Sequence, residues 1–280
     1  MTITPTSTLR HTLLKAEIVP VTRLAPEERS SMLELMQEYY EAVTAREFLS
    51  DLSKKDSVII LRDSSGAIRG FSTLVTIRVR LDGRPLRAVF SGDTVIDRRF
   101  WGGRALGNAF LHYLFAVKIK SPLEPLYWLL ISKGYKTYLM MANNFSEHYP
   151  RFEKPTPAGA KAVLDLCYSK LYPETYDPQR GVIAAAGNAC RLRPSVAGVT
   201  LALLKSNPRI AFFEECNPGW REGVELACIA KMTLLMPIRY ALKVIIADRV
   251  MKPLARVSRH LFHSLLRPEQ EAGQERDREL

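Results

Sequence analysis

The stretch from Phe90 to Phe110 constrains the fold more than any other part of this 280-residue chain. It begins with strand-forming residues (FSGDTVI), continues through an arginine- and glycine-rich turn, and ends in apolar residues at helical spacing (ALGNAF). A glycine turn before a helix lets backbone N–H groups approach an anion, and the helix dipole favours negative charge there. Because a short glycine motif is weakly specific, two interpretations stay open: a phosphate-binding turn, or an ordinary basic strand-to-helix connection.

The residues around this stretch predict an alternation of strands and helices. Upstream we expect a strand, two helices and three antiparallel strands, at 16–24, 26–43, 44–52, 57–62, 68–81 and 86–96. An Asp-Gly pair at 82–83 predicts a hairpin between the last two strands. Downstream, the helix after the turn leads to a short apolar strand at 126–131 and to a further helix that ends at ANNFSEHYPRF.

This order of elements resembles the GCN5-related N-acetyltransferase (GNAT) superfamily, from about Ala16 to Phe152. Gly103-Arg104-Ala105 is similar to the second half of the superfamily's pyrophosphate loop. Phe100 stands at the leading basic position, so either Arg98 or Arg99 takes that part, or Arg99 pairs with Gly102 in a shifted register. Asn144, Tyr149 and Phe152 look like the asparagine, tyrosine and phenylalanine of the superfamily's last helix and terminal motif.

The resemblance implies an α+β fold with a GNAT-like mixed, mostly antiparallel twisted sheet flanked by helices, and an inserted or appended helical C-terminal region. The implied donor is acyl-CoA or an acyl-4'-phosphopantetheine carrier protein, without a metal. The expected function is an N-acyltransferase that moves an acyl group from a thioester to a small amine or amino acid. The alternative is a non-catalytic protein of this fold that binds acyl-CoA or an anionic membrane surface.

Acyl transfer needs a polarised carbonyl, a base for the amine and a proton for the leaving sulfur. The resemblance assigns the sulfur's proton to Tyr149. Asp93 is the expected general base or, alternatively, a turn residue after Gly92; His148 and Glu147 are alternative bases. The positions expected to bind the donor are Thr94, Val95, Ile96, Arg98, Arg99, Gly102, Gly103, Arg104 and Ala105.

A formal net charge of +11 calls for an acidic partner. The alternatives are a phosphate-bearing cofactor, an acidic acyl carrier protein and the surface of a membrane. Nucleic acid ranks below these, because the sequence has no helix-turn-helix, zinc-finger or RNP-like motif.

The four cysteines lack CxxC spacing and are expected to be reduced and buried, and the five histidines do not form a metal-binding pattern. No apolar run approaches the length of a membrane span, and the N-terminal residues lack the apolar core of a signal peptide. We therefore expect a cytoplasmic protein, with peripheral contact to a membrane as an open alternative.

The second half of the chain allows two organisations. Residues 155–208 are rich in proline and glycine, and they are either an insertion in an acyltransferase domain spanning 16–235 or the start of a second domain. Ser195–Leu204 can be strand or helix. The runs Arg209–Glu214 and Gly223–Met232, separated by Asn-Pro-Gly, predict a hairpin that completes the sheet.

The ends of the chain carry three further predictions. Residues 1–15 are expected to be flexible and 268–280 to be disordered. The region 236–267 combines apolar residues at helical spacing with many arginines and lysines. It is either a helix packed on the protein with a solvated basic face, or a helix that contacts an anionic membrane or an acidic partner.

Overall fold

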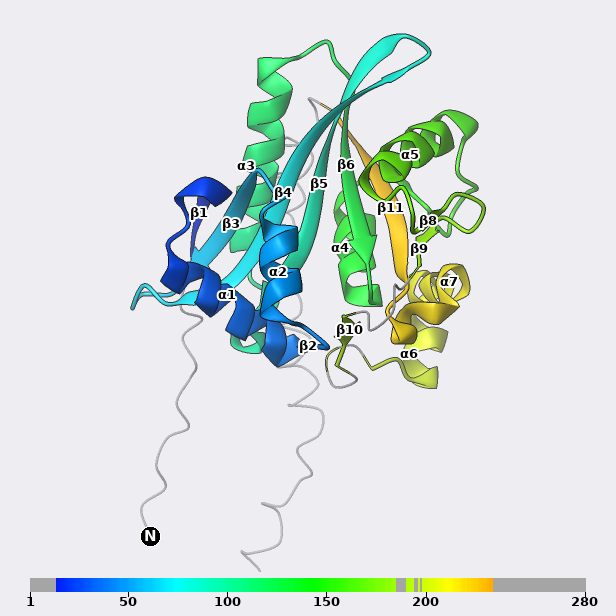
Figure 1. The fold of residues 1–280 in the computed structure, drawn as a ribbon. Helices are drawn as coiled ribbons and strands as arrows, with labels where there is room; N and C mark the ends of the chain where they lie inside the picture. The colour runs from blue at the N-terminus through cyan, green and yellow to red at the C-terminus, as the bar shows by residue number, and fades with distance from the viewer. Residues whose placement is uncertain (1–13, 185–189, 194–195, 197, 234–280) are drawn as a thin grey trace, which may run out of the picture. The chain divides into compact units, whose positions relative to one another are not determined.

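The computed structural model describes residues 14–184, 190–193, 196 and 198–233 (Figure 1). The described residues all belong to one compact unit. The predictions for residues 1–13, for the basic region 236–267 and for the tail 268–280 lie outside the described residues.

A sheet of nine strands is the centre of the described part of the chain, in the order β1-β3-β4-β5-β6-β11-β9-β8, with β7 also paired to β11 (Figure 1). The strands are β1 Lys15–Pro20, β3 Ser57–Arg62, β4 Ile68–Leu81, β5 Arg84–Ile96, β6 Leu126–Ser132, β7 His148–Tyr149, β8 Tyr176–Asp177, β9 Val182–Ile183 and β11 Glu225–Met232. Neighbours are antiparallel except β5 and β6, which are parallel. The predicted mixed, mostly antiparallel sheet is confirmed.

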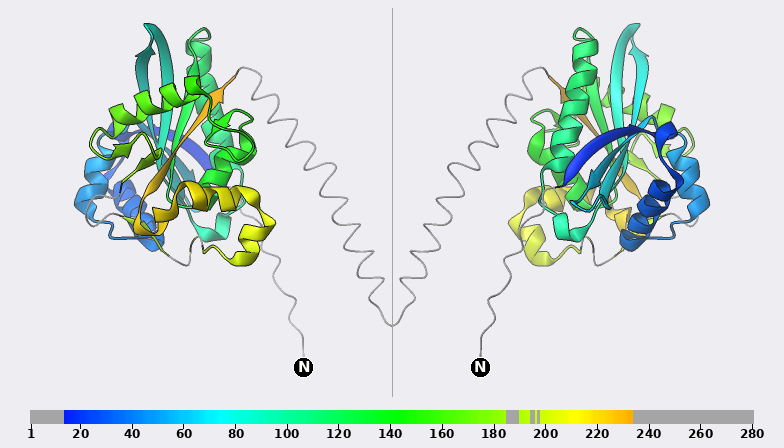
Figure 2. Two further views of the ribbon diagram at one scale, coloured as in Figure 1. Left: turned by 90° about the vertical axis from the view of Figure 1, so that its right-hand side faces the viewer. Right: turned by 90° about the vertical axis from the view of Figure 1, so that its left-hand side faces the viewer.

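Helices cover both faces of this sheet (Figure 2). They are α1 Pro26–Tyr39, α2 Ala45–Leu52, α3 Ala105–Lys120, α4 Tyr135–Asn144, α5 Ala158–Leu171, α6 Leu201–Ser206 and α7 Pro208–Cys216. Side chains of α1, α2 and α5 bury one face, where Phe71 and Phe90 are nearly inaccessible. On the opposite face, Trp128 of β6 packs between Phe110 of α3 and Phe145 after α4, with both ring centroids 4.7 Å away.

The elements predicted from Ala16 to the helix after the fifth strand are confirmed in kind and order, but two of them are shorter than predicted. The first strand ends at Pro20, where a 3-10 helix follows, and the first helix ends at Tyr39, where the short strand β2 follows. Local signals explain why these elements form. Thr44 accepts a hydrogen bond from the Glu47 amide and begins α2, as an N-cap should. Asp82 and Gly83 both have positive φ angles, 50° and 75°, which form the tight turn between β4 and β5.

The predicted hairpin in the second half is wrong in its first strand. Residues 209–214 lie within α7, because the Asn207 side chain accepts a hydrogen bond from the Arg209 amide (3.1 Å) and Pro208 occupies the first turn. The second run is a strand, β11, but it pairs with β6 and not with 209–214. In the apolar run 195–204, helix α6 begins at Leu201.

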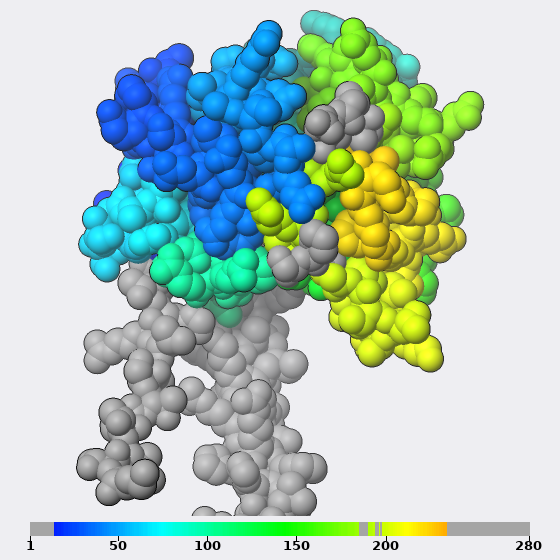
Figure 3. Space-filling view, turned by 60° about the horizontal axis from the view of Figure 1, so that its bottom comes forward, coloured from blue at the N-terminus to red at the C-terminus, as the bar shows by residue number. Residues whose placement is uncertain are grey.

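Part of the segment between β7 and β11 crosses the molecule to α1. The two-residue strand β10, Arg191–Leu192, pairs with β2, Tyr40–Glu41, which follows α1. Leu192 and Val196 pack on the core under α1 and α2, and we call residues 190–193 and 196 the strap. Figure 3 shows yellow-green atoms of this region against the blue atoms of α1 and β2.

Candidate functional site

The parallel strands β5 and β6 separate in the middle of the sheet. They pair from Arg87↔Leu126 to Ser91↔Leu130, and beyond that point β5 continues to Ile96 paired only with β4. The free edge of residues 92–96 therefore faces a gap in the sheet, where its backbone groups pair with no residue of β6. A ligand in extended conformation can bind along such an edge.

A β-bulge in β5 marks the point of separation. Thr94 lies opposite Ser72 and Ser91 opposite Leu74, so that Gly92 and Asp93 together face Thr73 alone. A Cβ on Gly92 would lie 2.9 Å from the Thr73 hydroxyl oxygen and 3.1 Å from the Phe90 ring, so any other residue there would force these side chains to move. The bulge turns the Asp93 side chain toward the face covered by α1 and α2, since Val95 also packs on that face.

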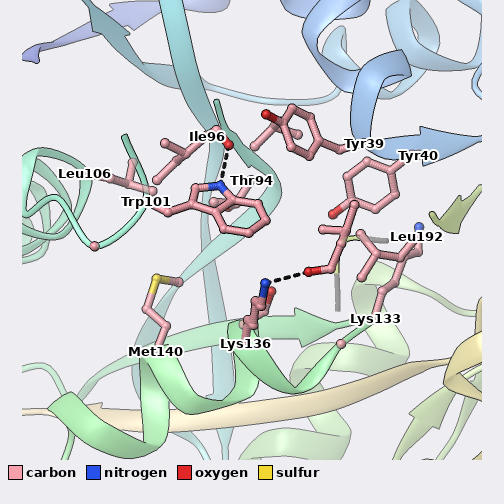
Figure 4. A pocket seen from close by; sticks show the side chains of 15 residues that line it. Tyr39, Tyr40, Thr94, Ile96, Trp101, Leu106, Lys133, Lys136, Met140 and Leu192 are labelled. Carbon is pink, nitrogen blue, oxygen red and sulfur yellow. Dashed lines mark hydrogen bonds between the residues drawn. The ribbon is translucent and has the colours of Figure 1, made fainter. Parts of the chain in front are cut away.

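A cavity of about 310 Å³ opens between the free edge of β5 and the start of α4 (Figure 4), and we call it the large cavity. Its lining is mainly apolar and aromatic and comes from α1, β5, the turn after it, α3, α4 and the strap. The lining residues are Tyr39, Tyr40, Thr94, Val95, Ile96, Trp101, Gly102, Leu106, Lys133, Gly134, Lys136, Thr137, Met140, Leu192 and Val196.

Trp101 lies across this cavity (Figure 4). Its indole N–H donates a hydrogen bond to the Ile96 carbonyl (2.7 Å), and the Lys136 ammonium lies 4.0 Å from its ring centroid. Lys136 also donates to the Val196 carbonyl of the strap (2.5 Å). Trp101 is 38% exposed and occupies a backbone carbonyl of the free edge.

A smaller cavity of about 40 Å³ adjoins the large one at the bulge, and we call it the small cavity. Tyr40, Thr94, Lys133 and Thr137 line both. Asp93, Glu225 and Met36 line the small cavity only. It has room for a group the size of an amine or a water molecule.

Several charged side chains surround the small cavity. The Lys133 ammonium lies 3.0 Å from a Glu225 carboxylate oxygen, and the Lys55 ammonium lies 2.7 Å from Asp51. Burial, followed by the neighbouring Asp51 carboxyl, raises the pKa of Asp93 to about 7, although Lys55 and Lys133 oppose this shift. Burial opposes ionisation of Asp51 as well, but Lys55 holds the pKa of that carboxyl below its usual value. Asp93 can therefore exchange a proton near neutral pH.

In the turn after β5, one of the arginines is paired with a neighbouring aspartate. The 3-10 helix Arg98–Phe100 follows Asp97, whose carboxylate accepts hydrogen bonds from the Arg99 amide and guanidinium. The hydrogen bonds from Arg99, opposed by burial, hold the pKa of Asp97 below its usual value. The Arg98 guanidinium lies over the Tyr39 ring, and the Arg98 amide donates to the Tyr39 hydroxyl oxygen (2.6 Å).

The end of this turn leads into α3. Gly102 has a φ of +82°, which glycine adopts at little cost, and Gly103, Arg104 and Ala105 lead directly into the helix. The N–H groups of Ala105, Leu106 and Gly107 come too early in α3 to have an acceptor four residues before them within the helix, so they can bind an anion.

The structure brings only some of the predicted residues to this site. Asp93 lines the small cavity, and Thr94, Val95, Ile96 and Gly102 line the large one. Glu147 and Tyr149 line a different cavity, of about 190 Å³, beside α5. Phe90 of β5 pairs with Leu129 of β6, Leu129 pairs with Ile229 of β11, and Ile229 pairs with Tyr149 of β7. Three strand spacings, about 14 Å, therefore separate Tyr149 from β5.

His148 is also remote from both cavities, which it does not line. It is 1% exposed, and its Nδ1 donates to the Phe145 carbonyl (2.7 Å). Burial lowers the pKa of His148. A buried, neutral imidazole on β7 packs in the sheet and does not reach the bulge.

Sequence reasoning missed Tyr40 and Glu225, which line the small cavity. It also missed Asp51 and Lys55, whose charges act on Asp93 from outside both linings. Tyr40 follows a helix and gives no local signal beyond an apolar face. Glu225 begins a strand far from β5 in the sequence, and only the pairing of β11 with β6 places it beside Lys133.

The described residues contain neither a metal-binding cluster nor a membrane-spanning helix. Within the ranges given above, no three histidine, cysteine, aspartate or glutamate side chains converge in a way that could bind a metal ion. The helices in the same ranges are all too short or too polar to cross a membrane.

No protein-family model matches the sequence, and a search of curated proteins finds no similar sequence. Solved structures similar to this chain include a GNAT family N-acetyltransferase from Escherichia coli in complex with CoA, at 15% identity, covering 48% of this chain and 69% of that one, with a TM-score of 0.34. An acetyltransferase from Trypanosoma brucei is 20% identical over 51% of this chain and 100% of its own (TM-score 0.36). The ribosomal-protein-S18-alanine N-acetyltransferase from Escherichia coli is 18% identical over 50% and 84% (TM-score 0.32). Each of these likenesses covers about half of this chain, at low identity and with a low TM-score.

Proposed function

We propose that this protein is an acyl-CoA-dependent N-acyltransferase whose donor lies in the large cavity and whose acceptor amine lies in the small one. The observation that supports this most directly is the separation of β5 and β6 beyond Ser91 and Leu130, with Asp93 in the lining of the small cavity. A thioester along the free edge of β5 would bring its carbonyl next to an acceptor beside Asp93.

The diphosphate of the donor fits the turn from Arg98 to Ala105. Its negative charge would meet the first turn of α3 and the Arg98 side chain. Arg99 contributes less net charge there, because Asp97 already pairs with it. The pantetheine arm would then follow residues 94–96 after Trp101 has moved aside.

Trp101 makes donor binding measurable. Trp128 and Trp220 are buried, so Trp101 is the exposed one of the three tryptophans. Adding coenzyme A should change the fluorescence of the wild-type protein and of a Trp220→Phe control, and the change should disappear in Trp101→Phe. If coenzyme A leaves the fluorescence and the melting temperature of the wild type unchanged, the proposed donor site is wrong.

We further propose that the acyl group is a long chain delivered by an acyl carrier protein. The net charge of +11 favours an acidic acyl carrier protein, which basic side chains attract over long distances. The apolar lining of the large cavity suits a longer acyl chain, at about 0.8 kcal/mol for each methylene buried. Release of free thiol should be compared for acetyl-CoA, long-chain acyl-CoA and long-chain acyl carrier protein, and a clear preference for acetyl-CoA would exclude the long-chain donor.

Turnover separates this proposal from the alternative of a non-catalytic binding protein. The enzyme releases free thiol from the thioester in proportion to an added amine or amino acid acceptor. A protein that only binds acyl-CoA shows the change in Trp101 fluorescence without thiol release above the uncatalysed rate.

Tyr40 suits the role of proton donor to the leaving sulfur. Its side chain lines both cavities, and Figure 4 shows the hydroxyl pointing into the space below Trp101. Burial raises the pKa of Tyr40, although Lys133 opposes the shift, so the hydroxyl keeps its proton at neutral pH.

The pair Tyr40→Phe and Tyr149→Phe decides which tyrosine acts. Loss of a proton donor should lower kcat by about 10²-fold in Tyr40→Phe. Tyr149→Phe, which removes the hydroxyl beside α5, should change kcat by less than threefold. The reverse result would restore the role that the sequence predicted for Tyr149.

A further inference from the structure

Lys133 occupies the junction between the two cavities. It directly follows β6, at the point where β6 has separated from β5, and it lines the large and the small cavity. Its side chain is 20% exposed. An ammonium group in this position faces the donor on one side and the acceptor on the other.

Two contacts fix this ammonium group in place. A Glu225 carboxylate oxygen lies 3.0 Å from it, and the Tyr40 ring centroid lies 5.8 Å away. Although burial opposes the charged form, Glu225 raises the pKa of Lys133, so the lysine stays charged at neutral pH. Taking a cation out of water is costly, and Glu225, whose side chain is 13% exposed, offsets that cost.

The other lysines at the site have different surroundings. Lys136 lines only the large cavity and engages Trp101 and the strap. Lys55 pairs with Asp51 and lies over the Phe90 ring, outside both linings. Lys133 is therefore the cation of the described residues that both cavities share.

Resting on the function proposed above, we propose that Lys133 is a catalytic residue whose ammonium stabilises the negative charge that forms on the thioester oxygen. The neutral acceptor nitrogen attacks the carbonyl carbon, a C–N bond forms, and the carbonyl π electrons move to the oxygen beside Lys133. Asp93 takes the proton that the nitrogen loses. When the oxyanion collapses, the C–S bond breaks, and the sulfur leaves with the electron pair and takes a proton from Tyr40, which Asp93 then restores.

The test must distinguish loss of the Lys133 charge from disruption of its ion pair with Glu225. Lys133→Met alone does both, because it leaves Glu225 buried without this partner. The double variant Lys133→Met/Glu225→Gln removes both charges together. We expect it to lower kcat by about 10² to 10³-fold, the usual loss when one oxyanion donor is removed, with KM for the donor changed less than threefold. Lys120→Met, on an exposed lysine at the end of α3, should retain wild-type kcat.

Further variants and measurements make the result specific. Glu225→Gln keeps the ammonium and should lose less than tenfold in kcat, and Lys133→Arg should recover part of the activity. Because Lys133 favours ionised Asp93, its loss should also move the acid limb of the pH–rate profile to higher pH. Coenzyme A binding by Trp101 fluorescence and the melting temperature confirm that each variant is folded.

Near-wild-type kcat in the double variant would overturn the role of Lys133, since an ion pair that serves only packing can be replaced by an uncharged pair. That outcome leaves the proposed function intact, because the wild type would still release thiol. Absence of thiol release from the wild type with every donor and acceptor tried would instead refute the proposed function itself.

Discussion

Replacing Asp93 by asparagine is expected to lower kcat/KM by about 10² to 10⁴-fold, the range for loss of a general base. Asparagine keeps the size of the side chain and its place at the bulge but cannot accept the amine proton. Turnover is measured by thiol release at saturating donor. Asp82→Asn, in the exposed turn between β4 and β5, is the matched control, since asparagine tolerates the positive φ of 50° at that position.

The pH dependence follows from the pKa of Asp93, which is raised to about 7. The ionised carboxylate is the base, so the wild-type rate should rise with pH through about 7 and then level off. Asp93→Asn should lack this rise. A wild-type rate that is flat between pH 5 and pH 8.5, or an asparagine variant with near-wild-type kcat/KM, would remove Asp93 from the mechanism.

The same shift has a consequence for stability, with a definite sign. Between the ordinary pKa of a carboxyl group and about 7, the folded protein holds a proton on Asp93 that the unfolded chain has lost. This contribution to stability therefore decreases as the pH rises from about 4 to about 7. The Asp93→Asn variant lacks this pH-dependent contribution. The melting temperature of the variant minus that of the wild type should therefore increase as the pH rises from about 4 to about 7.

Replacing Trp128 by alanine is expected to destabilise the protein by about 3 to 5 kcal/mol, the range for a large buried aromatic residue. The Trp128 ring is 2% exposed and lies 4.7 Å from each of the Phe110 and Phe145 rings. Its indole N–H also donates to the Ser91 hydroxyl (2.8 Å), so Ser91 would lose a buried partner.

Denaturant unfolding measures this loss, with the Trp128→Phe variant as an intermediate case. Phenylalanine keeps an aromatic ring between α3 and the end of α4 but loses the hydrogen bond to Ser91. A loss below 1 kcal/mol in Trp128→Ala would mean that α3 and α4 do not pack on β6 as described.

The first half of the fold was predictable because each of its elements carries a local signal. The Asp82-Gly83 turn and the Gly102 turn each follow from a short run of residues. Asp93 to Ile96 are consecutive on β5, so a single strand brings all four of these residues to the linings of the two cavities.

The remainder of the fold depends on contacts between distant segments or on a competing local signal. Residues 209–214 are as apolar as a strand, but the Asn207-Pro208 start makes them a helix. Tyr149 was predicted from its place in a motif, and its position beside α5 follows from strand pairing that the motif does not reveal. Glu225 and Lys133 meet only because β11 pairs with β6, and no spacing in the sequence indicates that.

The position of β11 also sets an order for folding during synthesis. When β6 and Lys133 have left the ribosome, the strand that will cover the other edge of β6 is still about ninety residues away from the exit. Such non-local pairing is slow compared with the formation of hairpins such as β4–β5. The nascent chain therefore exposes an apolar strand edge for several seconds, at an elongation rate of about 5 to 20 residues per second, and chaperone binding at β6 would protect it until β11 arrives.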